Sequence, residues 1–266
     1  MRTDKKMNAP MELLERPPAP ISVLGFGACL ITGYPLPEEA GFFGMAVKRA
    51  AVELNRGIDH KIVTITSCTA PKAVTRLAED VLPQRPDIVV FQFGQSDIKV
   101  AVKRLWREVT GQQRSPKEPV LVTEKPLRLN HRIDLFLRAC AGLALGARPY
   151  TLRDDYRQSI AKMVETVVSA GIYPIVFTPF VFDNFLSDAW GRCYSRDLVD
   201  DFAGRDDVCV INGWEALAGH PRPRILLHDG MHLTRLGHQI LADRLRMELV
   251  ECIKLRRVQA PSAMNA

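Results

Sequence analysis

Short apolar runs alternate with longer amphipathic runs along most of the chain, and this alternation limits the folds open to it. The apolar runs are nearly continuous and rich in branched side chains, which is typical of strands buried on both faces of a parallel sheet. The longer runs have helical spacing. We therefore predict an α/β domain with a doubly wound, mostly parallel five-stranded sheet and helices on both faces. The predicted strands cover residues 21–26, 61–66, 87–93, 173–178 and 208–211, and the clearest helices cover 41–54, 73–82, 154–170 and 233–255.

The predicted domain covers residues 21–255 of the 266, with flexible segments at 1–20 and 256–266. Residues 98–150 differ from the rest in charge, because they hold eleven Lys or Arg against four acidic residues. Two helical patterns, at 98–110 and 127–147, identify this segment as a helical insertion after the third strand. Ligands bind at the carboxyl ends of strands in such sheets. From its position we expect the insertion to form a lid over the site. For its charge we favour a solvated basic face on two packed helices, and the alternative is that it attracts an anionic substrate or surface.

Composition and patterning exclude several classes of protein. The chain is 47% hydrophobic and 25% charged, as globular domains are. It contains no run of 18 apolar residues and no apolar segment near its start, so we expect a cytoplasmic protein without integral membrane association. Six isolated cysteines, with no CxxC pair or Cys/His cluster, argue against a disulfide framework and a metal site. The basic segment lacks interleaved aromatic residues, so nucleic acid is not an expected partner. The oligomeric state is left open.

Two segments carry the candidate reactive side chains. The first loop contains Gly25-x-Gly27, a fragment of a dinucleotide fingerprint, but Leu30 replaces the third glycine and two nearby prolines interrupt the helix that should follow. We therefore predict no cofactor. The second segment, 228–238 (HDGMHLTRLGH), leads into the last predicted helix. Asp229 precedes His232 by three residues, a spacing that lets a carboxylate orient an imidazole as a catalytic triad requires.

Together these segments resemble the SGNH (GDSL-type) hydrolase family. The family's first block, Gly-Asp-Ser-(Leu/Ile)-Thr-x-Gly, aligns with residues 27–33 (GACLITG). Its third block, Gly-x-Asn-Asp, aligns with 94–97 (GQSD), and its last block, Asp-Gly-x-His-x-(Thr/Asn)-x-x-Gly, aligns with 229–237 (DGMHLTRLG). The second block falls near 69–70. The resemblance implies the flavodoxin-like SGNH hydrolase fold and a hydrolase or acyltransferase that acts on an ester or thioester.

The resemblance also implies a role for each aligned residue. Cys29 replaces the nucleophilic serine, His232 is the base and Asp229 orients it, which makes a Cys-His-Asp triad. The backbone N–H of Ala70 and the hydroxyl of Ser96 stand where the family binds the oxyanion. The substrate would be a small molecule, and an anionic one suits the basic insertion. Because three of the family's four signature residues are replaced, the alternative is a non-catalytic protein that binds an acylated or glycosylated ligand, or a partner, through the basic insertion.

Overall fold

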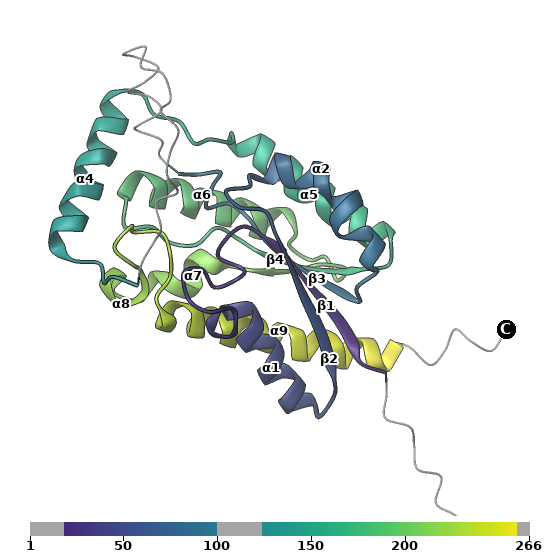
Figure 1. Cartoon of the computed structure of the whole chain (residues 1–266). Helices are drawn as coiled ribbons and strands as arrows, with labels where there is room; N and C mark the ends of the chain where they lie inside the picture. Colours follow the sequence, from purple (N-terminus) through teal and green to yellow (C-terminus); the bar gives the residue numbers. More distant parts are fainter. Residues whose placement is uncertain (1–18, 100–123, 260–266) are drawn as a thin grey trace, which may run out of the picture.

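A five-stranded parallel sheet forms the centre of the protein, in a computed structural model that describes residues 19–99 and 124–259 (Figure 1). The strand order is β2-β1-β3-β4-β5, and every neighbouring pair is parallel. This confirms the predicted fold class, and each predicted strand overlaps an observed one. The strands are β1 (Ile21–Gly27), β2 (Ile58–Thr64), β3 (Ile88–Gln92), β4 (Tyr173–Phe177) and β5 (Cys209–Ile211).

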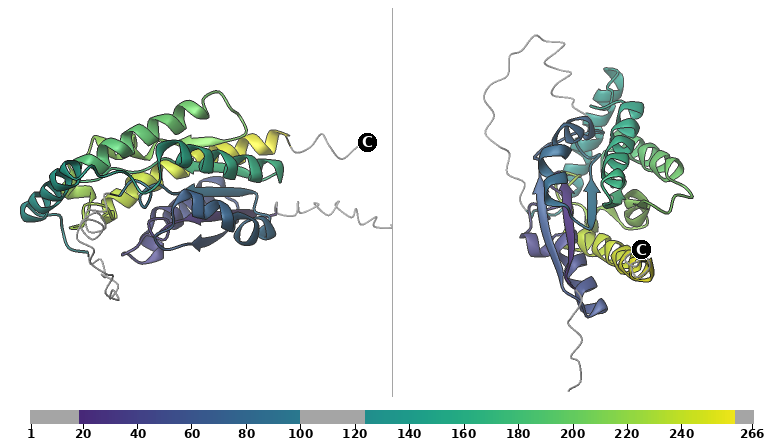
Figure 2. Two further views of the ribbon diagram at one scale, coloured as in Figure 1. Left: turned by 90° about the horizontal axis from the view of Figure 1, so that it is seen from above. Right: turned by 90° about the vertical axis from the view of Figure 1, so that its right-hand side faces the viewer.

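Helices cover both faces of the sheet (Figure 2). On one face, α1 (Phe42–Leu54) packs against α9 (Arg235–Gln259). The other face carries α2 (Ala70–Asp80), α5 (Arg153–Ser169) and α6 (Phe185–Asp201). Successive residues of a central strand point to opposite faces, so each strand contributes to both cores. Val90 of β3 belongs to the first core and Phe91 to the second, which explains why the central strands are continuously apolar.

Shorter helices complete the connections between these elements. The 3-10 helix η1 (Glu38–Ala40) precedes α1, and η2 (Leu82–Gln84) follows α2. After β5 come α7 (Gly213–Ala218) and α8 (Arg222–Ile225), which lead toward the loop that enters α9. Among the described residues, no helix is long and apolar enough to cross a membrane.

The sequence analysis did not predict α6, because the helix buries polar side chains that interrupt its apolar pattern. Ser195 is buried and donates to the carbonyl of Pro179 at 3.0 Å. Asp197 is also buried and pairs with Arg153 of α5. Asn184 is the N-cap of the helix, and its side-chain oxygen accepts hydrogen bonds from the Leu186 and Ser187 amides.

The predicted insertion is described only in part. Its second helix is α4 (Leu129–Ala144), within the predicted range 127–147. Its first predicted helix, at 98–110, lies outside the described residues apart from 98 and 99. The first four residues of the predicted C-terminal tail, 256–259, continue α9. Of the predicted N-terminal segment, only residues 19 and 20 are described.

Candidate active site

Cys29 and His232 meet at the carboxyl edge of the sheet, although 203 positions separate them in the chain. Cys29 lies in the turn that follows β1, and His232 lies in the loop that enters α9. The Cys29 Sγ is 3.2 Å from the His232 Nε2, within hydrogen-bond distance for sulfur. The sequence analysis paired these two residues, and the structure brings them together.

Asp229 completes the arrangement on the other side of the imidazole. Its Oδ2 lies 2.5 Å from the His232 Nδ1. Its Oδ1 accepts the backbone N–H groups of Met231 at 3.1 Å and His232 at 3.0 Å, which fixes the carboxylate within its own loop. With a proton on Nδ1, the lone pair of Nε2 faces the sulfur, as a general base requires.

The electrostatics of this pair favour a charged imidazole. Burial lowers the pKa of His232, but the hydrogen bonds and charges of Asp229 and Cys29 outweigh burial and raise that pKa to about 9. Burial likewise raises the pKa of Asp229, and the hydrogen bonds from His232 and two backbone amides outweigh it and lower that pKa to about 2. The imidazolium–carboxylate pair is therefore the stable form at neutral pH.

Close backbone packing sets the position of Cys29. A Cβ on Gly27 would lie 2.7 Å from the Gln92 carbonyl oxygen, so only glycine lets the two strands end this close together. That same carbonyl accepts the Ala28 N–H at 3.1 Å. Beyond the nucleophile, the Thr32 hydroxyl donates to the Cys29 carbonyl at 2.7 Å, and the Tyr34 ring meets the His232 ring edge-on at 5.3 Å.

The Ala70 amide differs from the sequence prediction. This N–H, expected to bind an oxyanion, instead donates to the Asp97 Oδ1 at 2.9 Å. Asp97 is fully buried and also accepts from the Thr151 hydroxyl at 2.6 Å and the Gly94 N–H at 3.1 Å. The carboxylate therefore occupies the Ala70 donor in this structure, and Asp97 ties the start of α2 to the loop after β3.

Two donors in the loops that follow β1 and β3 lack a hydrogen-bond partner in the described part of the chain. Ser96, the second predicted oxyanion ligand, is half-buried and its hydroxyl has no hydrogen-bond partner among residues 19–99 and 124–259. Within the same ranges, the backbone N–H of Cys29 has no acceptor either. Both groups are therefore available to bind a ligand.

The sequence analysis missed Gln95, which stands beside Ser96. Its Oε1 accepts from the Gln92 side chain at 2.8 Å, and its Nε2 is buried without a partner in the described part of the chain. Gln92 in turn accepts the amide of Ala28 through its carbonyl, so two hydrogen bonds link Gln95 to the residue before the nucleophile. The signal was present in the block 94–97, where an amide side chain stands one position before the aligned serine.

Three other histidines make contacts apart from Cys29 and Asp229. His238 is buried in the first turn of α9, where its Nδ1 accepts the Phe42 N–H at 3.3 Å and burial lowers its pKa to about 3. His131 and His228 meet edge-on at 5.7 Å. Among the described residues, no three His, Cys, Asp or Glu side chains are grouped as metal ligands.

Part of the basic insertion lies against the catalytic loop. The Lys125 carbonyl accepts the His228 N–H at 3.0 Å. The Leu135 side chain packs so tightly on the loop that a Cβ on Gly230 would lie 2.5 Å from its Cδ1. Arg132 pairs with Asp183 at 3.0 Å. These contacts place α4 beside the loop that carries His232, and residues 100–123 of the insertion lie outside the described ranges.

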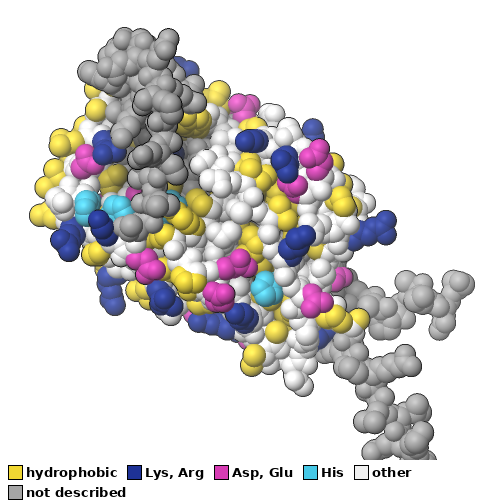
Figure 3. Space-filling model, viewed as in Figure 1, with side chains coloured by type: hydrophobic (Ala, Val, Ile, Leu, Met, Phe, Trp, Pro, Cys, Tyr) yellow, Lys and Arg dark blue, Asp and Glu magenta, His cyan; other side chains and the backbone are white. Residues whose placement is uncertain are grey.

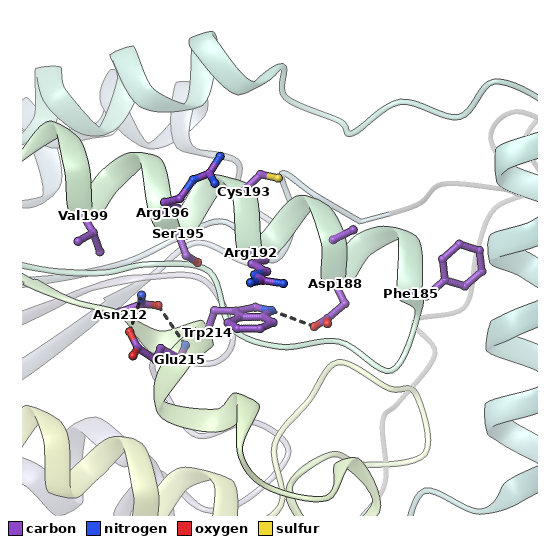
Figure 4. A pocket seen from close by; sticks show the side chains of 11 residues that line it. Phe185, Asp188, Arg192, Cys193, Ser195, Arg196, Val199, Asn212, Trp214 and Glu215 are labelled. Carbon is purple, nitrogen blue, oxygen red and sulfur yellow. Dashed lines mark hydrogen bonds between the residues drawn. The ribbon is translucent and has the colours of Figure 1, made fainter.

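A separate hollow of about 890 Å³ lies between α6 and α7 (Figure 4). The Arg192 guanidinium stacks 5.3 Å from the centre of the Trp214 ring, and the Trp214 indole donates to Asp188 at 3.1 Å. No triad residue lines this hollow. It is therefore distinct from the arrangement around Cys29.

No protein-family model and no curated protein sequence matches the chain. Solved structures do match, and the three described here are each covered over most of their length. A lipase from a goat rumen metagenome is 13% identical with a TM-score of 0.60, over 85% of this chain and 96% of the lipase. An acetyl-xylooligosaccharide esterase from Geobacillus stearothermophilus is 18% identical with a TM-score of 0.58, over 86% and 94%.

A third match is assigned to the lipolytic G-D-S-L family and comes from Desulfitobacterium hafniense. It is 16% identical with a TM-score of 0.55, over 85% of this chain and 98% of that one. Likeness at these identities concerns the backbone arrangement. The chain therefore has the α/β fold of the GDSL-type (SGNH) lipases and esterases.

Proposed function

We propose that this protein is a hydrolase or acyltransferase that acts on an ester or thioester of a small molecule, with Cys29 as the nucleophile. The observation that carries the proposal is the continuous contact from the Cys29 Sγ to His232 at 3.2 Å and from His232 to Asp229 at 2.5 Å. A nucleophile within reach of a base that a third group orients is the geometry that acyl transfer needs. The fold shared with lipases and esterases gives further support.

The reaction follows from the positions of the protons. His232 already holds the proton that the Cys29 thiol gives up, so the sulfur attacks the substrate carbonyl carbon as a thiolate beside the imidazolium, and a tetrahedral oxyanion forms. The imidazolium then gives that proton to the leaving oxygen or sulfur as the bond to it breaks, and a thioester remains on Cys29. Water, an alcohol, an amine or a thiol then attacks the thioester carbonyl and loses its proton to His232. The acyl group leaves, and the Cys29 thiol is restored.

Three nearby groups are our candidates for binding the oxyanion: the backbone N–H of Cys29, the Ser96 hydroxyl and the Gln95 side-chain amide. Each lacks a competing acceptor among the described residues. Removal of one such donor typically costs about 10²–10³ in rate. Because the Ala70 amide is already bound to Asp97, we expect a slower reaction than a full set of donors would give.

A non-catalytic binding protein is the second candidate. The engaged Ala70 amide favours it, because an incomplete set of oxyanion donors weakens stabilisation of the transition state more than it weakens ligand binding. For the enzyme, we propose a cytoplasmic location, where thiols stay reduced. All six cysteines lie in the described ranges and are free.

Intact mass spectrometry, with parallel measurement of nitrophenolate release, tests the proposal. The wild-type protein is mixed with p-nitrophenyl esters of several acyl lengths. We expect a single acyl adduct on Cys29, absent in Cys29→Ala, and release that falls at least about 100-fold in His232→Ala. Cys193→Ala is the matched control, because that thiol is exposed on α6 and lies outside the triad.

The outcomes separate the two candidates. An adduct that persists in Cys29→Ala, or an adduct on Cys193, refutes the assignment of Cys29 as the nucleophile. Binding of the ester without turnover, unchanged in His232→Ala, would support the non-catalytic candidate.

A further inference from the structure

The helix α4 has two apolar faces; the body of the protein covers one of them and meets the other at Phe136, whose ring centre lies 5.6 Å from that of Phe185 in α6. The inner face of α4 holds Leu135, Ala139 and Gly142, which are buried or half-buried. Figures 1 and 2 place α4 at one end of the molecule, and Figure 3 shows hydrophobic side chains along that edge. Among residues 19–99 and 124–259, the rest of the outer face is exposed.

The outer face is a continuous stripe of large apolar side chains, which we call the α4 stripe. Its five members are each more than half exposed: Leu129 (72%), Ile133 (52%), Phe136 (54%), Leu137 (60%) and Leu143 (62%). At about 200 Å² for a fully exposed large side chain, they present on the order of 600 Å² of apolar surface. That area is at the upper limit of the largest patch on a typical monomer, ~300–600 Å².

The spacing of the stripe is that of a helix–helix seam. Four of its members, Leu129, Ile133, Phe136 and Leu143, together with the half-buried Cys140 between the last two, follow one another at intervals of four, three, four and three residues, while Leu137 lies beside this seam. This average of 3.5 keeps one edge of a helix against a neighbouring helix, as in a coiled coil.

We propose that the α4 stripe pairs with the same stripe of a second copy of this chain, with the two helices antiparallel across a twofold axis at Phe136. Leu129 and Leu143 lie seven residues before and after Phe136. In an antiparallel pair centred on Phe136, Leu129 of one copy therefore lies beside Leu143 of the other. The self-complementary stripe supplies most of the ~800 Å² per partner that stable interfaces bury.

This dimer would also support the catalytic loop, since the inner face of α4 packs on Gly230 through Leu135. The inference rests on exposure and spacing alone, and it holds whether or not Cys29 is a nucleophile.

Sedimentation velocity of the full chain tests the oligomeric state at about 1–100 µM, under reducing conditions. We expect a wild-type dimer and a Phe136→Asp monomer with an unchanged far-UV circular dichroism spectrum. Val52→Asp is the matched control, because Val52 is a helical, 82% exposed apolar residue on α1 and should leave the dimer intact. A monomeric wild-type protein, or a dimer that Phe136→Asp does not dissociate, overturns the proposal.

Disulfide trapping tests the orientation. Oxidised Phe136→Cys should form a reducible dimer, because the residue on a twofold axis meets its own copy. Leu129→Cys should not, since its copy lies about 21 Å away along the antiparallel pair. A mixture of Leu129→Cys and Leu143→Cys should link. Linking of Leu129→Cys to itself, at a level above the wild-type background, refutes the antiparallel pairing.

Flotation with vesicles of phosphatidylglycerol and phosphatidylcholine tests whether the α4 stripe binds a lipid surface instead. Capture of a monomeric wild-type protein that Phe136→Asp abolishes would assign the stripe to a lipid surface and overturn the dimer.

Discussion

Replacing Asp229 with Asn should remove the pH-dependent part of the stability that the buried His232–Asp229 pair provides. The folded protein holds the pKa of His232 at about 9, against 6.5 in the unfolded chain. At 1.36 kcal/mol per pKa unit, this difference corresponds to about 3 kcal/mol. Because the folded-state pKa is the higher one, this stabilisation is fully present below pH 6.5 and is lost as the pH rises through 9.

The substitution is conservative in shape. The remaining Oδ1 of Asn can still accept the backbone amides of Met231 and His232, so the loop keeps those bonds. The Asn side chain has no charge to hold a proton on His232, so the pKa of that histidine should return toward 6.5. We therefore expect a loss of stability of about 3 kcal/mol at pH 6.5 and a much smaller loss above pH 9.

Urea unfolding of the two proteins, followed by tryptophan fluorescence in reducing buffer, measures this difference. The comparison at each pH cancels the titration of groups that the substitution leaves alone. NMR of labelled histidine, with His232→Gln to assign the signal, gives the pKa of His232 directly. A constant difference in unfolding free energy from pH 6.5 to 9.5, or a wild-type His232 that titrates near 6.5, would refute the reasoning.

Three further changes test the packing around the site. Gly33→Ala should lower the free energy of unfolding in urea by about 1–3 kcal/mol, because Gly33 has a φ of +88° and an added Cβ would lie 2.5 Å from the Gly41 Cα. Gly219→Ala is the control, because a Cβ there meets open space, and equal losses in the two variants would contradict this. Burial raises the pKa of Asp97 to about 6. The protonated carboxyl therefore stabilises the fold fully below pH 3.8, and this stabilisation is lost as the pH rises through 6. Between pH 4 and 7 the unfolding free energy of the wild-type protein should fall by up to about 3 kcal/mol relative to that of Asp97→Asn, and parallel curves of unfolding free energy against pH would argue against this. Arg153→Lys should lower the midpoint of thermal unfolding, because Lys cannot reproduce the two-pronged pairing with Asp197, and an unchanged midpoint would show that the pair adds nothing.

The sequence was sufficient for the inner strands, because a strand buried on both faces is apolar at nearly every position whatever its neighbours are. It was less exact for the largely exposed edge strand β2, which begins at Ile58 and not at the predicted residue 61. Residues 88–92 of β3 are all buried, and their pattern alone identified the strand. The same local signal failed for α6, whose buried Ser195 and Asp197 are satisfied by hydrogen bonds from other elements. A polar residue in a sequence gives no sign of whether a distant partner will allow it to be buried.

The sequence by itself determined which residues could supply the chemistry: the spacing of Asp229 and His232 within one loop, and a cysteine in the aligned block of another. Only the tertiary structure decided which of these groups meet. It places the Cys29 sulfur 3.2 Å from the imidazole and directs the Ala70 amide to Asp97. Local spacing fixes the geometry of neighbours along the chain, whereas a hydrogen-bond donor is free or occupied according to what the fold brings beside it.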